Sequence, residues 1–257
     1  MKVHQEEISE ITRFIKNHAG NSLEYYETQY QGYLKPIEPL KKIDGSVRIL
    51  EVGVGTGWFP IMCKMRGLQC KGLEISPQLV EYAREWGRSL GVEPDIELGN
   101  LEDDQVGDAV YDIIIASNVF EHVEDWKLGV RRIFKALKPG GIMFFESTNK
   151  FSFTSGEYHL PLYGWYPNAM RYFLRKKLEN PDVMKLGIDF HQFRYPTLRR
   201  EFQRVGFSKI LDRIQMAREE LVSTGMRRKI VGIGKSFPPA KALALTFSDA
   251  TRFLCVK

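Results

Sequence analysis

A glycine-rich stretch beside a carboxylate is the most chemically informative part of the sequence. Residues 49–57 read Ile-Leu-Glu-Val-Gly-Val-Gly-Thr-Gly, an apolar run followed by glycines at alternate positions. Glycine permits a tight turn and lets a ligand approach the backbone closely. Glu51 lies two residues before Gly53, and a carboxylate beside such a turn suits a cationic ligand better than a pyrophosphate. The stretch therefore predicts a small-molecule site at the end of a buried strand.

A second carboxylate, Glu74, follows at a meaningful distance. It lies 17 residues after Gly57, in the run Gly-Leu-Glu-Ile-Ser at 72–76. Nucleotide-binding α/β folds place an acid on the ribose hydroxyls about 20 residues beyond the glycine turn. The alternative is a surface glutamate beside a helix start. With the glycine turn in place, we expect Glu74 to bind a ribose.

The dinucleotide fingerprint GxGxxG does not fit this turn. Read from Gly53, its third glycine falls on Trp58, and an indole is a poor substitute where a helix and a strand must pack closely. A nicotinamide-dependent oxidoreductase is therefore the weakest of the competing functions.

Apolar runs that alternate with helical segments predict the elements that hold these residues. We expect helices within the first 45 residues, including one at 23–40, and between the strands, notably at 77–90, 125–137 and 196–205. The expected strands are 47–54, 72–75, 96–98, 112–116, 141–145, one from Phe207, and 251–256. This order predicts an α/β fold, a doubly wound and mainly parallel sheet whose last two strands form an antiparallel edge.

The domain organisation follows from the same pattern. Residues 1–45 are expected to form an N-terminal helical cap and residues 46–257 the ligand-binding domain. Residues 151–195 break the strand-helix rhythm and are expected to be an insertion after the fifth strand. The insertion is rich in aromatic residues and in Arg and Lys, at Arg171, Arg175, Lys176 and Lys177.

Composition places the chain among ordinary globular proteins. Of its 257 residues, 43% are hydrophobic and 27% charged, and no apolar run approaches the roughly 20 residues of a membrane-spanning helix. The N-terminus lacks the apolar core of a signal peptide. Three scattered cysteines argue against a disulfide framework or a zinc site and favour the cytoplasm.

Charge is divided unevenly along the chain. Residues 1–150 carry 18 Lys and Arg against 23 Asp and Glu, whereas residues 151–257 carry 19 against 9. A basic half could face nucleic acid, an anionic membrane surface or an acidic substrate, or simply be a solvated basic surface.

The glycine turn, Glu74 and the segment 111–123 together resemble class I methyltransferases that depend on S-adenosylmethionine (SAM). Within that superfamily the chain resembles the ubiquinone-biosynthesis-like O-methyltransferases, well over residues 45–150 and loosely beyond them. The resemblance implies SAM as cofactor and a Rossmann-like seven-stranded sheet with an antiparallel last strand. SAM carries an ammonium and a sulfonium and no phosphate, which agrees with the acidic turn.

The resemblance also assigns roles to individual residues. The glycines of the turn would face the methionine moiety, Glu51 would anchor the turn, and Glu74 with Ile75 would hold the ribose. Asn100 stands where the family often has an Asp that accepts a hydrogen bond from the adenine amine, and Leu101 would pack on the adenine. The predicted cofactor-binding residues are Glu51, Gly53, Val54, Gly55, Gly57, Glu74, Ile75, Asn100, Leu101, Ser117 and Asn118.

The segment after the fourth expected strand bears on metal binding and on the acceptor. Some relatives in the ubiquinone pathway bind a divalent metal with acidic and histidine side chains in this segment. Here Asn118 stands where one acid would be needed, so we predict no metal. The run Asn118-Val119-Phe120 also lacks the Pro-Pro-aromatic pattern of enzymes that methylate the amines of bases.

Histidines are the candidate bases, because transfer of a methyl group to a hydroxyl benefits from removal of its proton. The candidates are His122, His159 and His191, each with a structural role as the alternative. His4 and His18 are expected to lie outside the domain core.

The predicted function is transfer of a methyl group from SAM to a small-molecule or lipid-like acceptor, to oxygen. The aromatic and basic insertion would suit an amphipathic acceptor or allow peripheral membrane contact, or its aromatic residues would form its own small core. The alternatives are an RNA or protein methyltransferase, suggested by the basic half, and a SAM-binding protein without catalysis. No RNA-binding module is recognisable, so nucleic acid is the less favoured partner.

Overall fold

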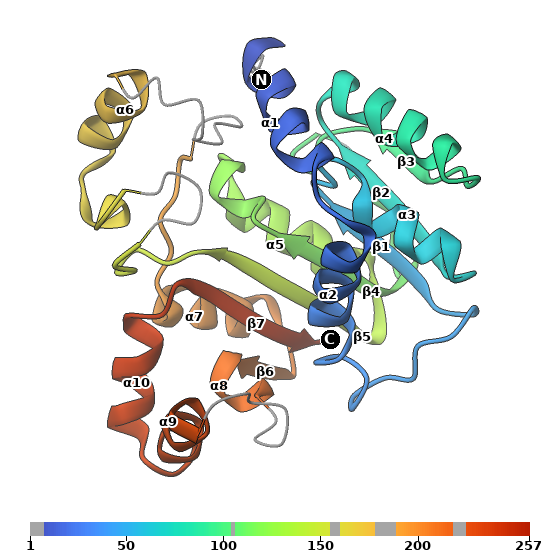
Figure 1. Ribbon diagram of the computed structural model, residues 1–257. Coiled ribbons are helices and arrows are strands. Elements are labelled where there is room, and N and C mark those ends of the chain that lie inside the picture. Colours follow the sequence, from blue (N-terminus) through green and yellow to red (C-terminus); the bar gives the residue numbers. More distant parts are fainter. Residues whose placement is uncertain (1–7, 104–105, 155–159, 178–188, 218–224) are drawn as a thin grey trace.

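The structure is a computed structural model of the 257-residue chain (Figure 1). It describes residues 8–103, 106–154, 160–177, 189–217 and 225–257. His159 and His4 lie outside these described residues, so neither histidine can be placed.

The core of the molecule is a seven-stranded sheet in the order β3-β2-β1-β4-β5-β7-β6. All described strand pairs are parallel except those made by β7, which runs antiparallel to both β5 and β6. The strands are β1 (Arg48–Val52), β2 (Gln69–Glu74), β3 (Asp95–Leu98), β4 (Tyr111–Ser117), β5 (Leu137–Thr148), β6 (Lys209–Asp212) and β7 (Ala250–Val256). All seven strands fall where the sequence predicts them, and the predicted fold class is confirmed.

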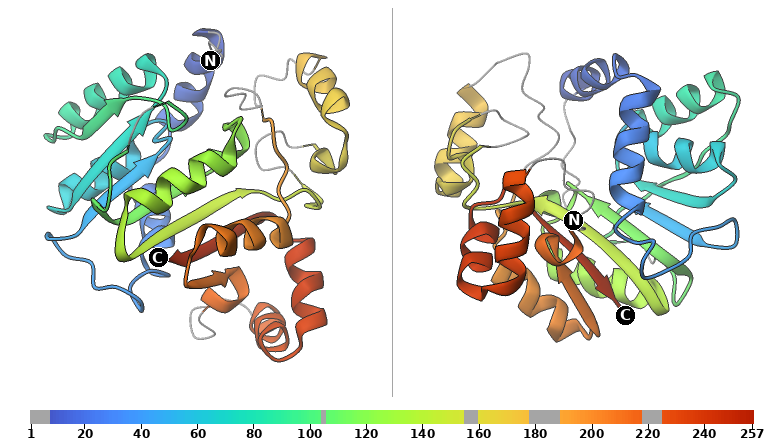
Figure 2. Two further views of the ribbon diagram at one scale, coloured as in Figure 1. Left: turned by 180° about the vertical axis from the view of Figure 1, so that it is seen from behind. Right: turned by 60° about the horizontal axis from the view of Figure 1, so that its bottom comes forward.

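Helices cover both faces of the sheet (Figure 2). The helices of the described residues are α1 (Ile8–Ala19), α2 (Leu23–Leu34), α3 (Trp58–Met65), α4 (Pro77–Ser89), α5 (Trp126–Ala136), α6 (Asn168–Lys177), α7 (Tyr195–Val205), α8 (Arg213–Met216), α9 (Gly225–Ser236) and α10 (Pro238–Thr246), and α6 lies apart from the sheet (Figure 1). Two short 3₁₀ helices are η1 (Phe120–His122) and η2 (Tyr163–Trp165).

Strand β4 shows how the sheet is buried on both faces. Ile113 and Ile115 pack in a cluster with Tyr30 of α2 and Phe59 of α3. Ile114, between them in sequence, faces the other way into a second cluster, which contains side chains of α5 and α7. Because successive side chains of a strand point to opposite faces, the continuous apolar run at 113–115 requires cover on both sides. This cover holds the carboxyl ends of the central strands in place.

The second N-terminal helix is shorter than expected but is firmly attached to the sheet. It was expected to reach residue 40, and α2 ends at Leu34. It starts at a helix cap in which the Ser22 side chain accepts a hydrogen bond from the Tyr25 N–H. Its buried residues, Tyr26, Tyr30 and Leu34, attach it to the core.

The segment after β5 contains a buried ion pair. Arg171 of α6 and Asp189 are both fully buried and form a salt bridge, and the Tyr163 hydroxyl donates to the same carboxylate. The expectation that Arg171 contributes to a basic surface is therefore wrong, because its guanidinium is needed inside the segment. Tyr163 is also buried, whereas Trp165 stays partly exposed.

Helices α9 and α10, between β6 and β7, were not predicted from the sequence. They pack against each other and against α8, and Leu245 of α10 is buried in the core. No helix in the described residues is long and apolar enough to cross a membrane.

Candidate functional site

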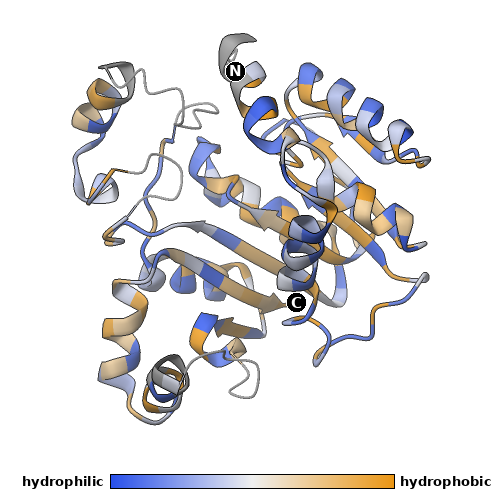
Figure 3. Cartoon of the chain, viewed as in Figure 1, coloured by the Kyte–Doolittle hydropathy of each residue, from blue (hydrophilic) through white to orange (hydrophobic). Residues whose placement is uncertain are grey.

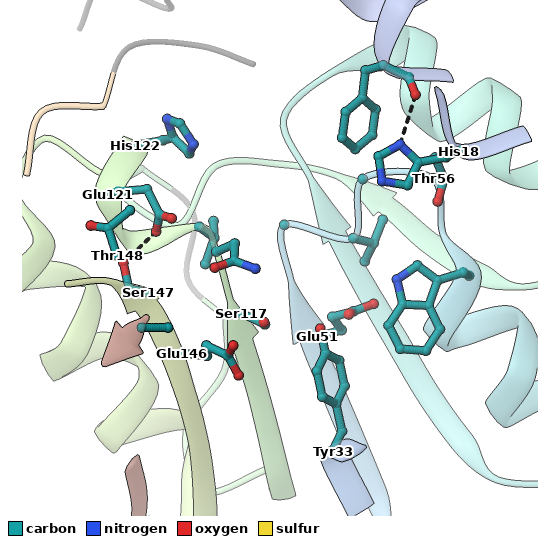
Figure 4. Close-up of a pocket in the computed structure, with 18 of the residues that line it drawn as sticks. His18, Tyr33, Glu51, Thr56, Ser117, Glu121, His122, Glu146, Ser147 and Thr148 are labelled. Atoms are coloured by element: carbon teal, nitrogen blue, oxygen red, sulfur yellow. Dashed lines mark hydrogen bonds between the residues drawn. The ribbon is translucent and has the colours of Figure 1, made fainter. Parts of the chain in front are cut away.

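A cavity of about 690 Å³ opens at the carboxyl ends of β1, β2, β4 and β5. Its position agrees with the rule that open α/β sheets bind ligands beyond the carboxyl ends of their strands. Figure 4 shows side chains that approach the cavity from two sides: from β1 and the N-terminal helices, and from the ends of β4 and β5. This volume is in the ordinary range for small-molecule sites.

The turn between β1 and α3 forms one wall of the cavity. Gly53, Gly55 and Gly57 all have positive φ angles, of 69°, 54° and 77°. A Cβ atom on Gly53 would lie 2.6 Å from Val119, so a side chain there would push the turn away from β4. Gly53 and Gly55 line the cavity, as does Val54 between them. The backbone conformation of this turn therefore requires glycine, as the sequence predicted.

Gly57 has a different task. A Cβ atom there would lie 2.4 Å from the Cβ of Ala83, on α4, and Gly57 is not among the cavity-lining residues. It precedes α3 in a left-handed conformation and lets the start of α3 approach α4. Contact of Gly57 with the cofactor stays a prediction.

Glu74 ends β2 and is almost fully buried. Its Oε2 accepts a hydrogen bond from the Gly55 N–H at 2.9 Å, and its Oε1 accepts from the N–H groups of Ile75 and Ser76 at 2.9 and 3.0 Å. Burial raises the pKa of Glu74, and these three backbone donors oppose the shift. Glu74 and Ile75 both line the cavity. The Gly55 hydrogen bond shows that Glu74 holds the turn, and the anchoring role that the resemblance assigned to Glu51 stays a prediction.

Glu51 lies on the cavity floor, beside Tyr33 (Figure 4). Its Oε2 is buried and has no hydrogen-bond partner among the described residues. Burial, aided by Cys63 and Glu74, raises the pKa of Glu51 well above its usual range. A buried carboxylate oxygen without a donor is rare and costly, so this atom points to a ligand that supplies one.

Aromatic side chains from distant parts of the chain complete this half of the cavity. They are Phe14 of α1, Tyr33 of α2 and Trp58 of α3. His18 also lines the cavity, with its Nδ1 2.9 Å from the Phe14 carbonyl oxygen. His18 is half-buried on α1 and is not one of the core residues, as expected, but it reaches the cavity, which the sequence did not predict. Nothing local in the sequence of α1 or α2 indicated these contacts, because they depend on how the helices fold back over the sheet.

The ends of β4 and β5 form the opposite half. Ser117 and Asn118 line it as predicted from the sequence pattern, and Asn118 has a positive φ of 52°. Ser117 pairs with Glu146 across the two strands. Glu146 accepts a hydrogen bond from Arg252 Nε at 2.6 Å, so its charge is compensated from β7. Glu146 was not among the site residues predicted from the sequence.

Glu121 is the most perturbed group of this half. It is 2% exposed, and its Oε2 accepts a hydrogen bond from the Ser147 hydroxyl at 2.6 Å. Burial raises the pKa of Glu121 to about 7, and the carboxyl groups of Asp189 and Glu146 add to the shift while Ser147 opposes it. Glu121 is therefore a carboxyl group that can exchange a proton near neutral pH.

The three candidate histidines differ in their position relative to the cavity. His122 lines the cavity next to Glu121. His191 does not line it: its Nε2 lies 2.9 Å from the Glu124 carbonyl oxygen, and its backbone N–H donates to the Glu121 carbonyl oxygen. The structure thus places His191 where it supports the segment that carries Glu121. His159 lies outside the described residues.

Asn100 and Leu101 follow β3, and neither is among the residues that line the cavity. The Asn100 Oδ1 accepts a hydrogen bond from the Glu102 N–H at 2.8 Å. Leu101 is buried in the hydrophobic core. Their proposed contacts with adenine stay predictions.

The segment after β5 reaches the cavity directly. Ser152, Thr154, Gly164 and Gln192 are lining residues on this side. Asn149, which lines the cavity just after β5, donates from Nδ2 to the carbonyl oxygens of residues 245, 246 and 248. Residues of the expected insertion thus contribute to the wall of the same cavity as the glycine turn.

No group of three or more His, Cys, Asp or Glu in the described part of the chain could hold a metal ion. The absence of a metal from the working protein stays a prediction.

Comparison with known protein families adds an independent finding. A family model described as a methyltransferase domain matches residues 22–211. The ubiquinone biosynthesis O-methyltransferase of Xanthomonas oryzae is 31% identical over 106 residues, which are 40% of this chain and 44% of that enzyme. The enzyme of the same name from Bordetella avium is 27% identical over 165 residues, covering 60% of this chain and 68% of its own. The match to the Xanthomonas enzyme therefore spans less than half of that relative.

Solved structures agree on the fold. An S-adenosylmethionine-dependent methyltransferase from Mesorhizobium loti superposes with a TM-score of 0.55 at 20% identity, covering 87% of this chain and 96% of its own. Phosphoethanolamine N-methyltransferase 2 of Haemonchus contortus, solved with S-adenosyl-L-methionine, gives a TM-score of 0.61 at 14% identity, covering 99% of this chain and 58% of its own.

Proposed function

The chain belongs to the family of methyltransferase domains, and from this premise we propose that it transfers the methyl group of SAM to a hydroxyl oxygen of a small, amphipathic acceptor. SAM is its cofactor. The observation that carries the proposal is a cavity with two chemically different halves. One half contains the glycine turn with Glu51 and Glu74, and the other contains Glu121 and residues of the segment after β5.

The first half fits SAM by its donor and acceptor chemistry. The unpaired Oε2 of Glu51 would accept a hydrogen bond from an ammonium group, and Glu74 has capacity left to accept from a ribose diol. The positive φ angles of Gly53 and Gly55 keep the backbone of the turn open to the cofactor. SAM supplies an activated methyl group on sulfur, and the task of the protein is to position the acceptor and exclude water.

The second half supports a neutral or cationic acceptor over an anionic one. No Lys or Arg is found among the described lining residues, whereas this half has three acidic side chains, Glu121, Glu146 and Asp249. The names of the curated relatives support oxygen as the acceptor atom. We also propose that residues 151–195 act as the acceptor-side insertion and residues 1–45 as a cap over the cofactor.

Two measurements test the proposal. Calorimetry should give SAM binding in the micromolar range, weakened about tenfold to a hundredfold by Glu74→Ala, because a hydrogen bond to a charged acceptor is worth about 1.5–3 kcal/mol. The matched control is Glu81→Ala, an exposed glutamate on α4, which should leave the affinity unchanged. Transfer of labelled methyl groups from SAM into fractionated host metabolites and lipids should then identify the acceptor. If SAM binds to neither the wild type nor the control, the cofactor assignment is wrong. If SAM binds but no fraction takes up label, the acceptor proposal is wrong.

A further inference from the structure

Helices α9 and α10 form a hairpin at the edge of the molecule, beside β6 and β7 (Figure 1). Its inner side is fixed by packing. Leu245 of α10 is buried in the core, and a Cβ atom on Gly234 of α9 would lie 3.2 Å from Ile214 of α8. The remaining side of the hairpin therefore faces away from the protein.

Large apolar side chains occupy that outer side. Ile233 is 55% exposed, Phe237 56%, Leu243 63% and Phe247 37%. Figure 3 shows apolar colours along much of α10. Leu243 and Phe247 are four residues apart at the end of α10, so they lie on the same side of the helix. Single exposed apolar residues are ordinary, but a group of this kind marks an interaction surface.

The charged residues of the same segment are all basic. Residues 225–247 contain five Lys and Arg and no Asp or Glu. Lys241 pairs with Asp212 at 2.6 Å. Lys229 and Lys235 of α9 lie at the surface. The outer surface of the hairpin thus combines apolar side chains with an excess of positive charge.

Aromatic contacts connect this surface to the mouth of the cavity. Phe247 stacks on Phe153 and Trp165, with ring centroids 5.3 and 6.2 Å apart. Phe153 and Trp165 are themselves partly exposed, and their neighbours Ser152, Thr154 and Gly164 line the cavity. The apolar surface therefore continues from α10 to the segment that borders the cavity.

The charge and composition of the surface decide between occupants. A second copy placed on the same face by twofold symmetry would bring like charges together. The phosphates of a nucleic acid would pair with the Lys side chains, but they would offer no apolar contact to aliphatic side chains such as Leu243. A bilayer with anionic headgroups satisfies both, because apolar side chains enter the acyl boundary while Lys and Arg remain among the phosphates. We propose that the outer face of the α9–α10 hairpin docks on an anionic lipid bilayer.

This site differs from the membrane contact expected from the sequence, which was placed in residues 151–195. Arg171 of that segment is buried in an ion pair and cannot contact a headgroup. Docking through the hairpin would present the mouth of the cavity to the bilayer, from which an amphipathic acceptor could enter. That last step rests on the proposed function, whereas docking itself does not.

Co-sedimentation with vesicles tests the proposal without any acceptor. The full chain should bind vesicles of phosphatidylcholine with phosphatidylglycerol, bind pure phosphatidylcholine much less, and lose binding as salt rises. Each basic residue near an anionic surface contributes roughly a fivefold change in partitioning, so Lys229→Glu with Lys235→Glu should weaken binding by more than about tenfold. Leu243→Asp should weaken it about tenfold, because the apolar insertion is lost.

The matched control is Lys64→Glu on α3, an exposed lysine away from the hairpin. Calorimetric SAM binding by every variant checks that each is folded. The proposal is overturned if the wild type does not bind anionic vesicles, or if Lys64→Glu weakens binding as much as the hairpin variants. Vesicle binding without methyl transfer would instead support docking and count against the proposed function alone.

Discussion

Replacement of Glu121 by Gln offers a quantitative test of the electrostatics of the cavity. The carboxyl group is buried, and its described partner is the Ser147 hydroxyl at 2.6 Å. Other charged groups that influence it are carboxylates, Asp189 and Glu146, each of which has its own arginine partner. Burial therefore works with like charge to hold the pKa of Glu121 at about 7. Gln is of nearly the same size, remains neutral, and can still accept from Ser147.

The size and sign of the effect follow from the two pKa values. A rise from the usual 4.5 to about 7 corresponds to about 3 kcal/mol, at 1.36 kcal/mol per unit. Because the pKa is raised in the folded state, the contribution of Glu121 to stability is fully present below its unfolded pKa. It is lost as pH rises through about 7. The wild type should therefore lose about 3 kcal/mol relative to Glu121→Gln between about pH 4.5 and about pH 8.

Urea unfolding of both proteins at about pH 4.5 and about pH 8 measures this difference directly. Other titrating groups, including Glu51, are common to both proteins and cancel. Glu124→Gln is the matched control, an exposed glutamate three residues away, and its difference from the wild type should not change with pH. If the difference for Glu121→Gln is equally constant, the reasoning about this buried carboxyl group is refuted.

Three further outcomes are expected. Arg171→Met should lower the free energy of unfolding by about 3 kcal/mol because it strands the buried Asp189 carboxylate, and adding Asp189→Leu should restore part of the loss in urea unfolding. Equal loss in both variants would contradict this. Trp165→Ala with Tyr166→Ala should keep SAM affinity by calorimetry yet abolish methyl transfer, and normal transfer would count against an acceptor-side insertion. Methyl transfer, once an acceptor is found, should survive a chelator. Loss with recovery on adding magnesium would show that a metal is required.

The parts of the site that sequence reasoning found are local in the chain. The glycine turn and Glu74 could be predicted because a buried strand, a turn and the following strand end leave their pattern in a short stretch. Gly57 shows the limit of such patterns, since it belongs to the same motif but serves the packing of α3 on α4. A short sequence pattern thus identifies the motif, but it does not show which of its residues contact the ligand and which serve packing.

The residues that sequence reasoning missed reach the cavity through tertiary packing. Tyr33 and His18 lie on helices that fold back from the N-terminus, and their own sequence carries only helical periodicity. Glu146 lies within the long strand β5, and its charge is compensated by a hydrogen bond from Arg252 on the antiparallel strand β7. Helices α9 and α10 were not predicted, because α9 contains three glycines and α10 begins with two prolines, which weaken helical expectations.

The hydrogen bonds of Asn149 connect the cavity to the hairpin. Its amide group lies in the cavity wall and also holds three carbonyl oxygens at and just beyond the end of α10. A displacement of the end of α10 would therefore reach the cavity wall through the Asn149 amide, as well as through the lining residues Asp249 and Ala250 that follow α10 in the chain. Coupling of this kind is reciprocal: whatever factor an occupied outer surface applies to acceptor affinity, a bound acceptor must apply to the affinity of that surface for its partner. If binding at the outer surface is coupled to acceptor binding, Asn149 is a residue through which that coupling would act in both directions.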